Sequence, residues 1–188
     1  GTTNGDEAGP VNGLFTVTQT AASSTDTVLS YSVTGTSSSG DDFTARSGTG
    51  TIAAGDTTAT ISVPVIDDSL VEATETVVVT LDSITSGDPQ ITIDGANDDD
   101  STENTHNDTA SITRSGTTNG DKAGPVNGLF TVTQTASSST DTVFSYSVTC
   151  PSSPGDDFTA LRGPVTISAV DTTATISVPV LDDSPLEP

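Results

Sequence analysis

Four carboxylates follow one β-branched run of the chain at close spacing. Asp67 and Asp68 come directly after the run Thr58–Ile66, and Glu72 and Glu75 arrive shortly afterwards. Hard cations such as Ca²⁺ bind roughly six to eight oxygens, mostly from carboxylates and carbonyls. Carboxylates crowded into one loop repel one another, and a bound cation relieves that repulsion. The spacing indicates either a Ca²⁺ site or a solvated acidic face, and by itself it leaves both interpretations open.

A further carboxylate, Asp42, stands in a separate loop. It belongs to the segment Gly40-Asp41-Asp42-Phe43, which connects two predicted strands. Loops at one end of a β-sandwich can converge, so Asp42 is a candidate to join the four carboxylates at a common tip.

A second acidic stretch runs over Asp94–Asp108. Its glycine and glutamate do not stand where an EF-hand loop needs them, so we expect a flexible, solvated loop there. His106 is the only histidine, and without a cysteine or second histidine beside it, it is a poor candidate for a zinc ligand. Asn107-Asp108-Thr109 fits the acceptor pattern for N-glycosylation, so Asn107 is a candidate glycan site.

The composition argues against several classes of function. With 26 acidic and 4 basic residues the formal net charge is −22, so nucleic acids and anionic membranes are poor partners. The sequence has no apolar run of about 18 residues, so membrane insertion is not expected. It also lacks a nucleophile elbow, a catalytic triad, a phosphate loop and a spaced acid–base pair, so we predict no catalytic residue and no enzyme.

Alternation of β-branched and polar residues predicts short strands throughout residues 1–113, which are the first copy of the repeat described below. In the clearest run, Thr58–Ile66, Ile61 and Val63 point to one side while Thr60 and Ser62 point to the other. Clusters of glycine, serine, aspartate and asparagine separate such runs, so we predict an all-β, antiparallel sandwich. The predicted strands are Leu14–Thr18, Val28–Val33, Gly50–Ala53, Thr58–Ile66, Thr76–Leu81, Gln90–Ile93 and Thr109–Thr113.

The chain nearly repeats itself. Residues 116–135 match residues 1–20 except that Lys122 stands in place of Glu7, and this offset of 115 residues is typical of a tandem domain array. We therefore expect one domain over residues 1–113 and a second over residues 114–188. The second copy repeats the first four strands, over Leu129–Thr133, Val143–Val148, Val165–Ile167 and Thr173–Leu181.

Residues 114–188 hold no counterpart of the last three predicted strands, so we expect the second sandwich to be incomplete within this chain. Four strands would leave an apolar sheet face open to water unless a partner covers it. At the join, Thr109–Ser115 is expected to form one continuous strand that closes the first copy and opens the second.

Several segments of the first copy together resemble the Calx-β domain family, which occurs in sodium/calcium exchangers and in large repetitive bacterial surface proteins. The resemblance covers most of the first copy and all of the second. The sequence is most similar to that of the bacterial repeats. It implies an immunoglobulin-like sandwich with Ca²⁺ at one tip. The matching segments are Gly40–Thr44, Gly50–Ile52, Ala54–Ile61 and Val65–Asp68, followed by Glu72 and Glu75-Thr76.

The resemblance also implies a set of Ca²⁺ ligands, to which Leu70 would add a backbone carbonyl. In the first copy the ligands would be Glu7, Asp42, Asp67, Asp68, Glu72 and Glu75. In the second copy the matching positions are Asp157, Asp182, Asp183 and Glu187.

The chain departs from the family pattern at four places. Ser69 stands where the family often has a third aspartate, and the predicted last strand runs into Arg114 rather than into an aspartate-rich stretch. In the second copy, Lys122 replaces the early glutamate and Glu75 has no counterpart. We therefore expect a single ion in the first copy and weak or no binding in the second.

These observations favour an extracellular structural or adhesive module, part of a multi-domain array or of a filament that assembles head to tail. Its partners would be adjacent repeats or neighbouring copies that complete each sandwich with a strand. One alternative is a Ca²⁺-sensing regulatory domain. Another is a non-catalytic carbohydrate- or ligand-binding module of a secreted protein, although few aromatic residues are available to stack on sugars.

Overall fold

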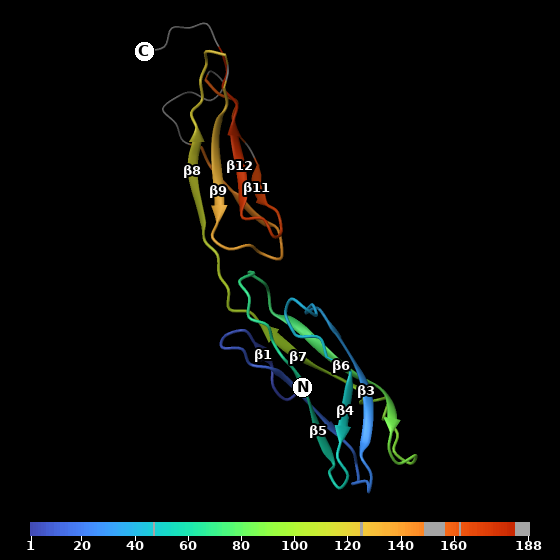
Figure 1. Ribbon diagram of the computed structural model, residues 1–188. Coiled ribbons are helices and arrows are strands. Elements are labelled where there is room, and N and C mark those ends of the chain that lie inside the picture. The colour runs from blue at the N-terminus through green and yellow to red at the C-terminus, as the bar shows by residue number, and fades with distance from the viewer. Residues whose placement is uncertain (47, 125, 149–156, 162, 183–188) are drawn as a thin grey trace. The chain divides into compact units, whose positions relative to one another are not determined.

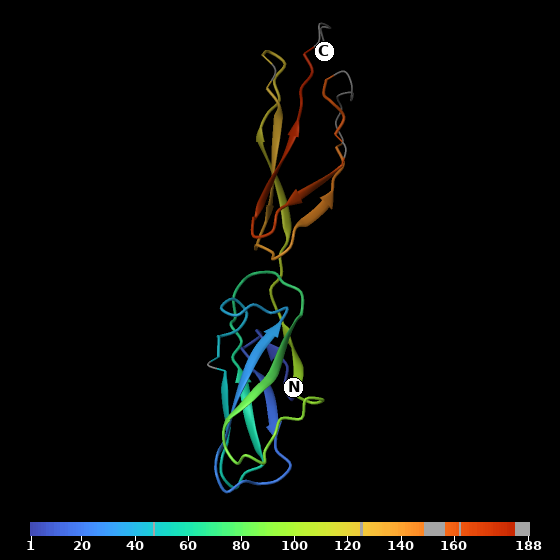
Figure 2. The same ribbon diagram turned by 90° about the vertical axis from the view of Figure 1, so that its right-hand side faces the viewer.

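The computed structural model describes residues 1–46, 48–124, 126–148, 157–161 and 163–182, and these form only strands and loops (Figures 1 and 2). They divide into two compact units. Unit 1 contains Gly1–Asp68 and Ala73–Asn107, and unit 2 contains Ser69–Glu72 and Asp108–Pro188. The all-β class predicted from the sequence is confirmed. The described part of the chain contains no helix of the length and apolarity needed to cross a bilayer.

Unit 1 is built from two sheets. The larger sheet has the order β1-β7-β6-β3-β4, and the smaller one pairs β2 with β5. Neighbouring strands are antiparallel except for β1 and β7, which run parallel. The strands are β1 (Gly5–Asp6), β2 (Gly13–Thr18), β3 (Thr27–Gly35), β4 (Thr49–Ile52), β5 (Thr58–Val63), β6 (Glu75–Ser86) and β7 (Asp99–Thr105).

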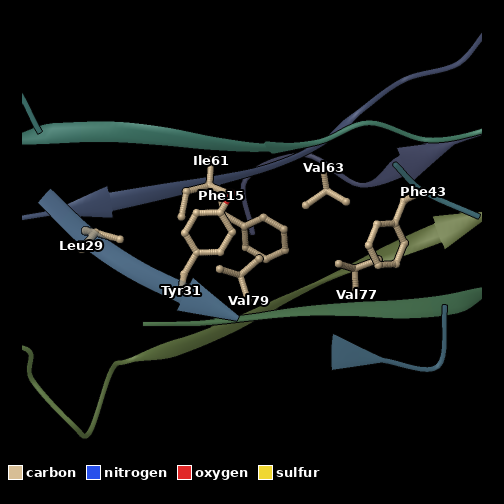
Figure 3. Packing of buried hydrophobic residues seen from close by; sticks show 8 residues of the cluster. All are labelled: Phe15, Leu29, Tyr31, Phe43, Ile61, Val63, Val77 and Val79. Carbon is tan, nitrogen blue, oxygen red and sulfur yellow. The ribbon is translucent and has the colours of Figure 1, made fainter. Parts of the chain in front are cut away.

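The core of unit 1 lies between these sheets. Figure 3 shows Ile61 and Phe15 of the smaller sheet facing Tyr31 and Val79 of the larger one. Side chains alternate between the two faces of a strand, and burying each of these large side chains contributes about 1.5–3 kcal/mol. The buried cluster consists of Phe15, Leu29, Tyr31, Phe43, Ile61, Val63, Val77 and Val79.

The strand that completes the larger sheet differs from the prediction. Gln90–Ile93 is predicted as a strand and is not one, whereas the acidic stretch predicted as a flexible loop contains β7. β7 pairs with β6 on one side and with β1 on the other. Aspartate and asparagine disfavour strands, but pairing on both edges outweighs that weak preference.

The predicted strand at the join serves unit 2 alone. β8 (Ile112–Thr118) pairs with β9 (Gly128–Gln134), whereas the edge beside β6 in unit 1 is filled by β7. The expectation of one continuous strand shared by both copies is therefore wrong, because β7 ends at Thr105, before β8 begins.

Unit 2 contains counterparts of the first four predicted strands. β12 (Thr173–Val178) pairs with β9, and β10 (Thr142–Ser145) pairs with β11 (Pro164–Ile167). Val132, Phe158 and Ile167 are buried in this unit, but Val143 of β10 is 59% exposed. Its counterpart strand β3 pairs on two edges, with β4 and with β6, whereas β10 pairs only with β11 among the described strands.

At Gly35, the last residue of β3, the backbone conformation and its close neighbours require a glycine. Its φ is +132°, and a Cβ there would lie 2.1 Å from the Thr76 carbonyl oxygen. We expect Gly35→Ala to lower the free energy of unfolding of unit 1 by about 2–4 kcal/mol, because strain and overlap add. Gly55→Ala is the control, since Gly55 also has positive φ but open space around it. Urea unfolding measures both, and equal losses would contradict the steric argument.

Candidate metal centre

Two strands and the segment after β1 bring polar side chains to one end of the unit 1 core. On β7 the inward-facing position of Asn104 is followed, two residues on, by His106. Glu75 of β6 stands opposite Asn104. Beyond β1, the Glu7 N–H donates to the Thr105 carbonyl at 3.1 Å, which continues the strand pairing. Backbone pairing therefore places Glu7, Glu75 and His106 at the same tip.

Asp42 reaches this tip from the loop before β4. Its carbonyl accepts the Ile66 N–H at 2.9 Å, and its carboxylate accepts the Ser38 N–H. The next residue, Phe43, is buried in the core and anchors the loop. Asp42 is only 3% exposed. A carboxylate is thus held inside the protein by an anchored loop.

Glu7 and His106 form a buried pair. Nδ1 of His106 lies 3.0 Å from Oε1 of Glu7, and their side chains are 1% and 0% exposed. Removing a carboxylate from water costs several kcal/mol unless charge and hydrogen bonds compensate. The imidazole supplies part of that compensation.

Glu75 adds a third carboxyl group, which is partly buried. Burial raises the pKa of its carboxyl group, and the charge of Asp42 and a hydrogen bond with Asp42 raise the pKa further, while His106 lowers it. Oε2 of Glu75 is buried and has no hydrogen-bond partner among the described residues. Two carboxylates so close together favour an additional positive charge between them.

The donor atoms of this tip fit one metal ion. One donor atom each from Asp42, Glu75 and His106 lies within 4.8 Å of the other two. Because Ca²⁺ binds oxygen at about 2.3–2.6 Å, two donors of one ion are at most about twice that distance apart. The open lone pairs of Glu75 Oε2 point to the same conclusion. The arrangement can therefore hold a divalent cation.

A protein-family model, that of the Calx-beta domain, matches residues 2–110 and again residues 103–188. The chain belongs to the Calx-beta domain family. The resemblance seen in the sequence is thereby confirmed for both copies. The chain is also similar to the crystal structure of calcium binding domain CBD12 of CALX1.1, with a TM-score of 0.47 and 16% identity over 95% of this chain and 72% of that one. CBD12 from CALX1.2 gives a TM-score of 0.46 and 16% identity over 96% and 72%. No curated protein matches.

Three of the ligand positions implied by the Calx-beta resemblance lie at this tip. Glu7 contacts His106, and Asp42 and Glu75 lie close enough to share an ion with it. Two other positions, Asp67 and Asp68, have exposed side chains. Glu72 lies in the segment Ser69–Glu72, which groups with unit 2.

In unit 2, one of the implied ligand positions, Asp157, forms an ion pair. Its carboxylate binds the Lys122 ammonium at 2.8 Å. Asp182 is exposed, and Asp183 and Glu187 lie outside the described residues. Asn107, the candidate glycan site, is exposed.

His106 is the residue of the tip that sequence reasoning missed. The stretch before it, Asp99–Thr105, has no apolar alternation, so the strand that carries His106 inward is not recognisable from its pattern. The one signal in the sequence is the family pattern, in which the closing strand runs into metal ligands. Here β7 is that closing strand, and it runs into His106-Asn107-Asp108.

Proposed function

We propose that this chain is a non-catalytic, tandem Calx-beta structural module whose first unit binds one Ca²⁺ at the tip made by Asp42, Glu75, His106 and Glu7. The observation that carries the proposal is the buried Oε2 of Glu75, which has no hydrogen-bond partner among the described residues and belongs to a carboxyl group beside Asp42. A cation would neutralise both groups and tie the loop before β4 to β6 and β7. The bound ion would thereby stiffen unit 1.

Ca²⁺ is favoured over softer metals by the donor set, which is mainly carboxylate oxygen. Membership of the Calx-beta family supports the same choice of ion. The His106 nitrogen is the one donor that suits Zn²⁺ or Mn²⁺ better than Ca²⁺. The metal preference of the tip is therefore a direct test of the proposal.

Calorimetric titration and thermal unfolding of the full chain test this function. CaCl₂ is expected to raise the unfolding temperature of unit 1, and EDTA to reverse the rise. MgCl₂ at the same ionic strength controls for screening of the net charge of −22. If CaCl₂ gives neither heat of binding nor a rise in unfolding temperature, the proposed Ca²⁺ site is wrong. The same conclusion follows if ZnCl₂ alone raises the unfolding temperature.

His106→Asp is expected to tighten Ca²⁺ binding about tenfold, because it adds an oxygen ligand and a negative charge. Without metal, the same variant should be less stable than the wild type, since Glu7 loses its partner. His106→Asn, which supplies oxygen without charge, is the matched control. Competition titrations against a calcium chelator give the affinities, and an unchanged or weaker affinity of the aspartate variant would contradict a role for position 106 in coordination.

We further propose that the module works outside the cell as one segment of a repeat array, with adjacent repeats or neighbouring copies as partners. The near-identical copies, the acidic surface and the single described partner of β10 support this role. A strand like β6, supplied by a neighbour, would pair with β10 and cover Val143. Electron microscopy and sedimentation of the native protein test it. Chains of beads or fibres are expected, and dispersed monomers of a stably folded chain would contradict it.

A Ca²⁺-sensing regulatory role is the second candidate, because tandem Calx-beta domains are related to the calcium-binding regulatory domains of sodium/calcium exchangers. It predicts that micromolar CaCl₂ changes the relative orientation of the two units, which small-angle scattering would detect. A structural module predicts stabilisation without that reorientation.

A further inference from the structure

We infer that the Lys122 ammonium occupies, in unit 2, the place that the metal ion takes in unit 1. In the second tip, a lysine side chain would then supply the positive charge that a bound metal ion supplies in the first. The inference deepens the function proposed above and rests on it for the description of unit 1. In this role Lys122 disfavours Ca²⁺ binding at the second tip.

The two copies carry opposite charges at one matching position. Over residues 1–20 and 116–135 they differ only at Glu7 and Lys122. Replacing a carboxylate by an ammonium changes the formal charge at this position by two positive units, which is the charge that a divalent cation brings. At this position, the lysine without metal therefore supplies the same change in charge as a divalent cation beside the glutamate.

The same backbone scaffold holds Glu7 and Lys122 in their two units. In unit 1, Asp6 and Val11 exchange hydrogen bonds at 2.9 and 2.7 Å, and in unit 2, Asp121 and Val126 exchange them at 2.9 and 2.8 Å. The aspartate side chain of each hairpin accepts an N–H from the residue two positions on, at 2.9 Å in both units. Residue 122 is thus presented to the tip of its unit as residue 7 is to its own.

The carboxylate-bearing loop that faces this residue is also held in the same way in both units. The carbonyl of Asp42 accepts the Ile66 N–H at 2.9 Å, and that of Asp157 accepts the Leu181 N–H at 2.9 Å. The residues that follow, Phe43 and Phe158, both anchor their loops in a core, at 4% and 8% exposure. Asp157 is therefore the unit 2 equivalent of Asp42 in structure as well as in sequence.

Lys122 and Asp157 form an ion pair. Nζ of Lys122 lies 2.8 Å from Oδ1 of Asp157, and the two side chains are 34% and 16% exposed. Ion pairs on an open surface contribute little, but a partly buried pair such as this one is screened less. The ammonium binds the carboxylate that in unit 1 belongs to the proposed metal site.

Amide hydrogen exchange of the full chain tests the inference, because each scaffold carries reporters. The Thr44 and Ile66 amides report on the tip of unit 1, and the Thr159 and Leu181 amides report on the tip of unit 2. In the wild type, CaCl₂ is expected to slow exchange of the first pair and to leave the second pair unchanged. Slowing of both pairs to the same extent would overturn the inference.

Lys122→Met removes the charge while keeping the length of the side chain. In EDTA we expect it to speed exchange at Thr159 and Leu181 about tenfold, whereas Lys122→Arg should preserve their protection. A double-mutant cycle with Asp157→Asn separates the pair from each single loss. If the effects of the two substitutions on amide exchange are additive, the Lys122 ammonium does not stabilise the Asp157 carboxylate, and the inference is overturned. This arm needs no metal, so it decides the inference even if unit 1 fails to bind Ca²⁺.

The converse substitution, Glu7→Lys, places an ammonium in the first tip at the position that Lys122 holds in the second. We expect the Thr44 and Ile66 amides to become insensitive to CaCl₂ and to keep their protection in EDTA. Glu7→Gln, the control, removes a carboxylate without adding a cation, so these amides should lose protection in EDTA. Identical behaviour of the two variants would contradict the substitution of an ammonium for a metal ion.

Discussion

Phe15→Ala is expected to lower the free energy of unfolding of unit 1 by about 3–5 kcal/mol, the range for deleting a buried aromatic ring. Phe15 is 3% exposed and faces Tyr31 and Val79 across the sandwich (Figure 3). The same substitution at the equivalent residue of unit 2, Phe130→Ala, should cost only about 1–2 kcal/mol, because less area is lost where a ring is half-buried. The two variants change the same residue in the same local sequence.

Unit-resolved hydrogen exchange in urea gives both values on the full chain, with exchange reporters on β5 and β12. A larger loss in unit 2 than in unit 1 would contradict the difference in burial. If a neighbour covers β10, the cost of Phe130→Ala should rise toward that of Phe15→Ala in the assembled state.

The strands that form the core can be predicted because their side chains alternate. Leu14–Thr18 is predicted and Gly13–Thr18 is observed, and Thr58–Ile66 is predicted where Thr58–Val63 is observed. The latter strand ends before Pro64, which has no N–H to donate to a sheet. Local pattern and local chemistry decide both boundaries.

β7 cannot be predicted in the same way, because its stability comes from its neighbours. Its buried positions are Thr102 and Asn104, which carry no apolar signal. Pairing with β6 and β1 brings together residues far apart in the sequence, and no local propensity reports such pairing. Without this strand, the sequence pattern leaves His106 as a lone histidine in a loop.

The other residues of the candidate site can also be predicted from the sequence only in part. Family position identifies Glu7, Asp42 and Glu75, which the structure brings to one tip. The same reasoning gives equal weight to Asp67 and Asp68, whose side chains are exposed. Sequence position identifies the loops of a tip, but the burial of each carboxylate depends on how the loop backbone is anchored.

Asp42→Asn and Asp67→Asn separate these two kinds of carboxylate. Asp42→Asn is expected to weaken Ca²⁺ binding about 100-fold, because it removes the charge of a buried ligand while an amide oxygen still accepts the Ser38 N–H. Asp67→Asn, at an exposed position of the adjoining loop, should weaken binding less than about threefold, since water screens its charge. Equal losses would show that the ion sits among the exposed aspartates.

The metal-free form should respond to Asp42→Asn in the opposite direction. Burial and the Asp42 charge raise the pKa of Glu75, so ionised Glu75 destabilises unit 1 at neutral pH, and this cost disappears as the pH falls and the group is protonated. Removing the Asp42 charge lowers the pKa of Glu75 toward its usual value. Thermal unfolding in EDTA at pH 7 should therefore show a unit 1 at least as stable as the wild type, with a smaller gain on acidification to pH 5. A variant that loses both the Ca²⁺ response and its metal-free stability would instead indicate that Asp42 only supports its loop.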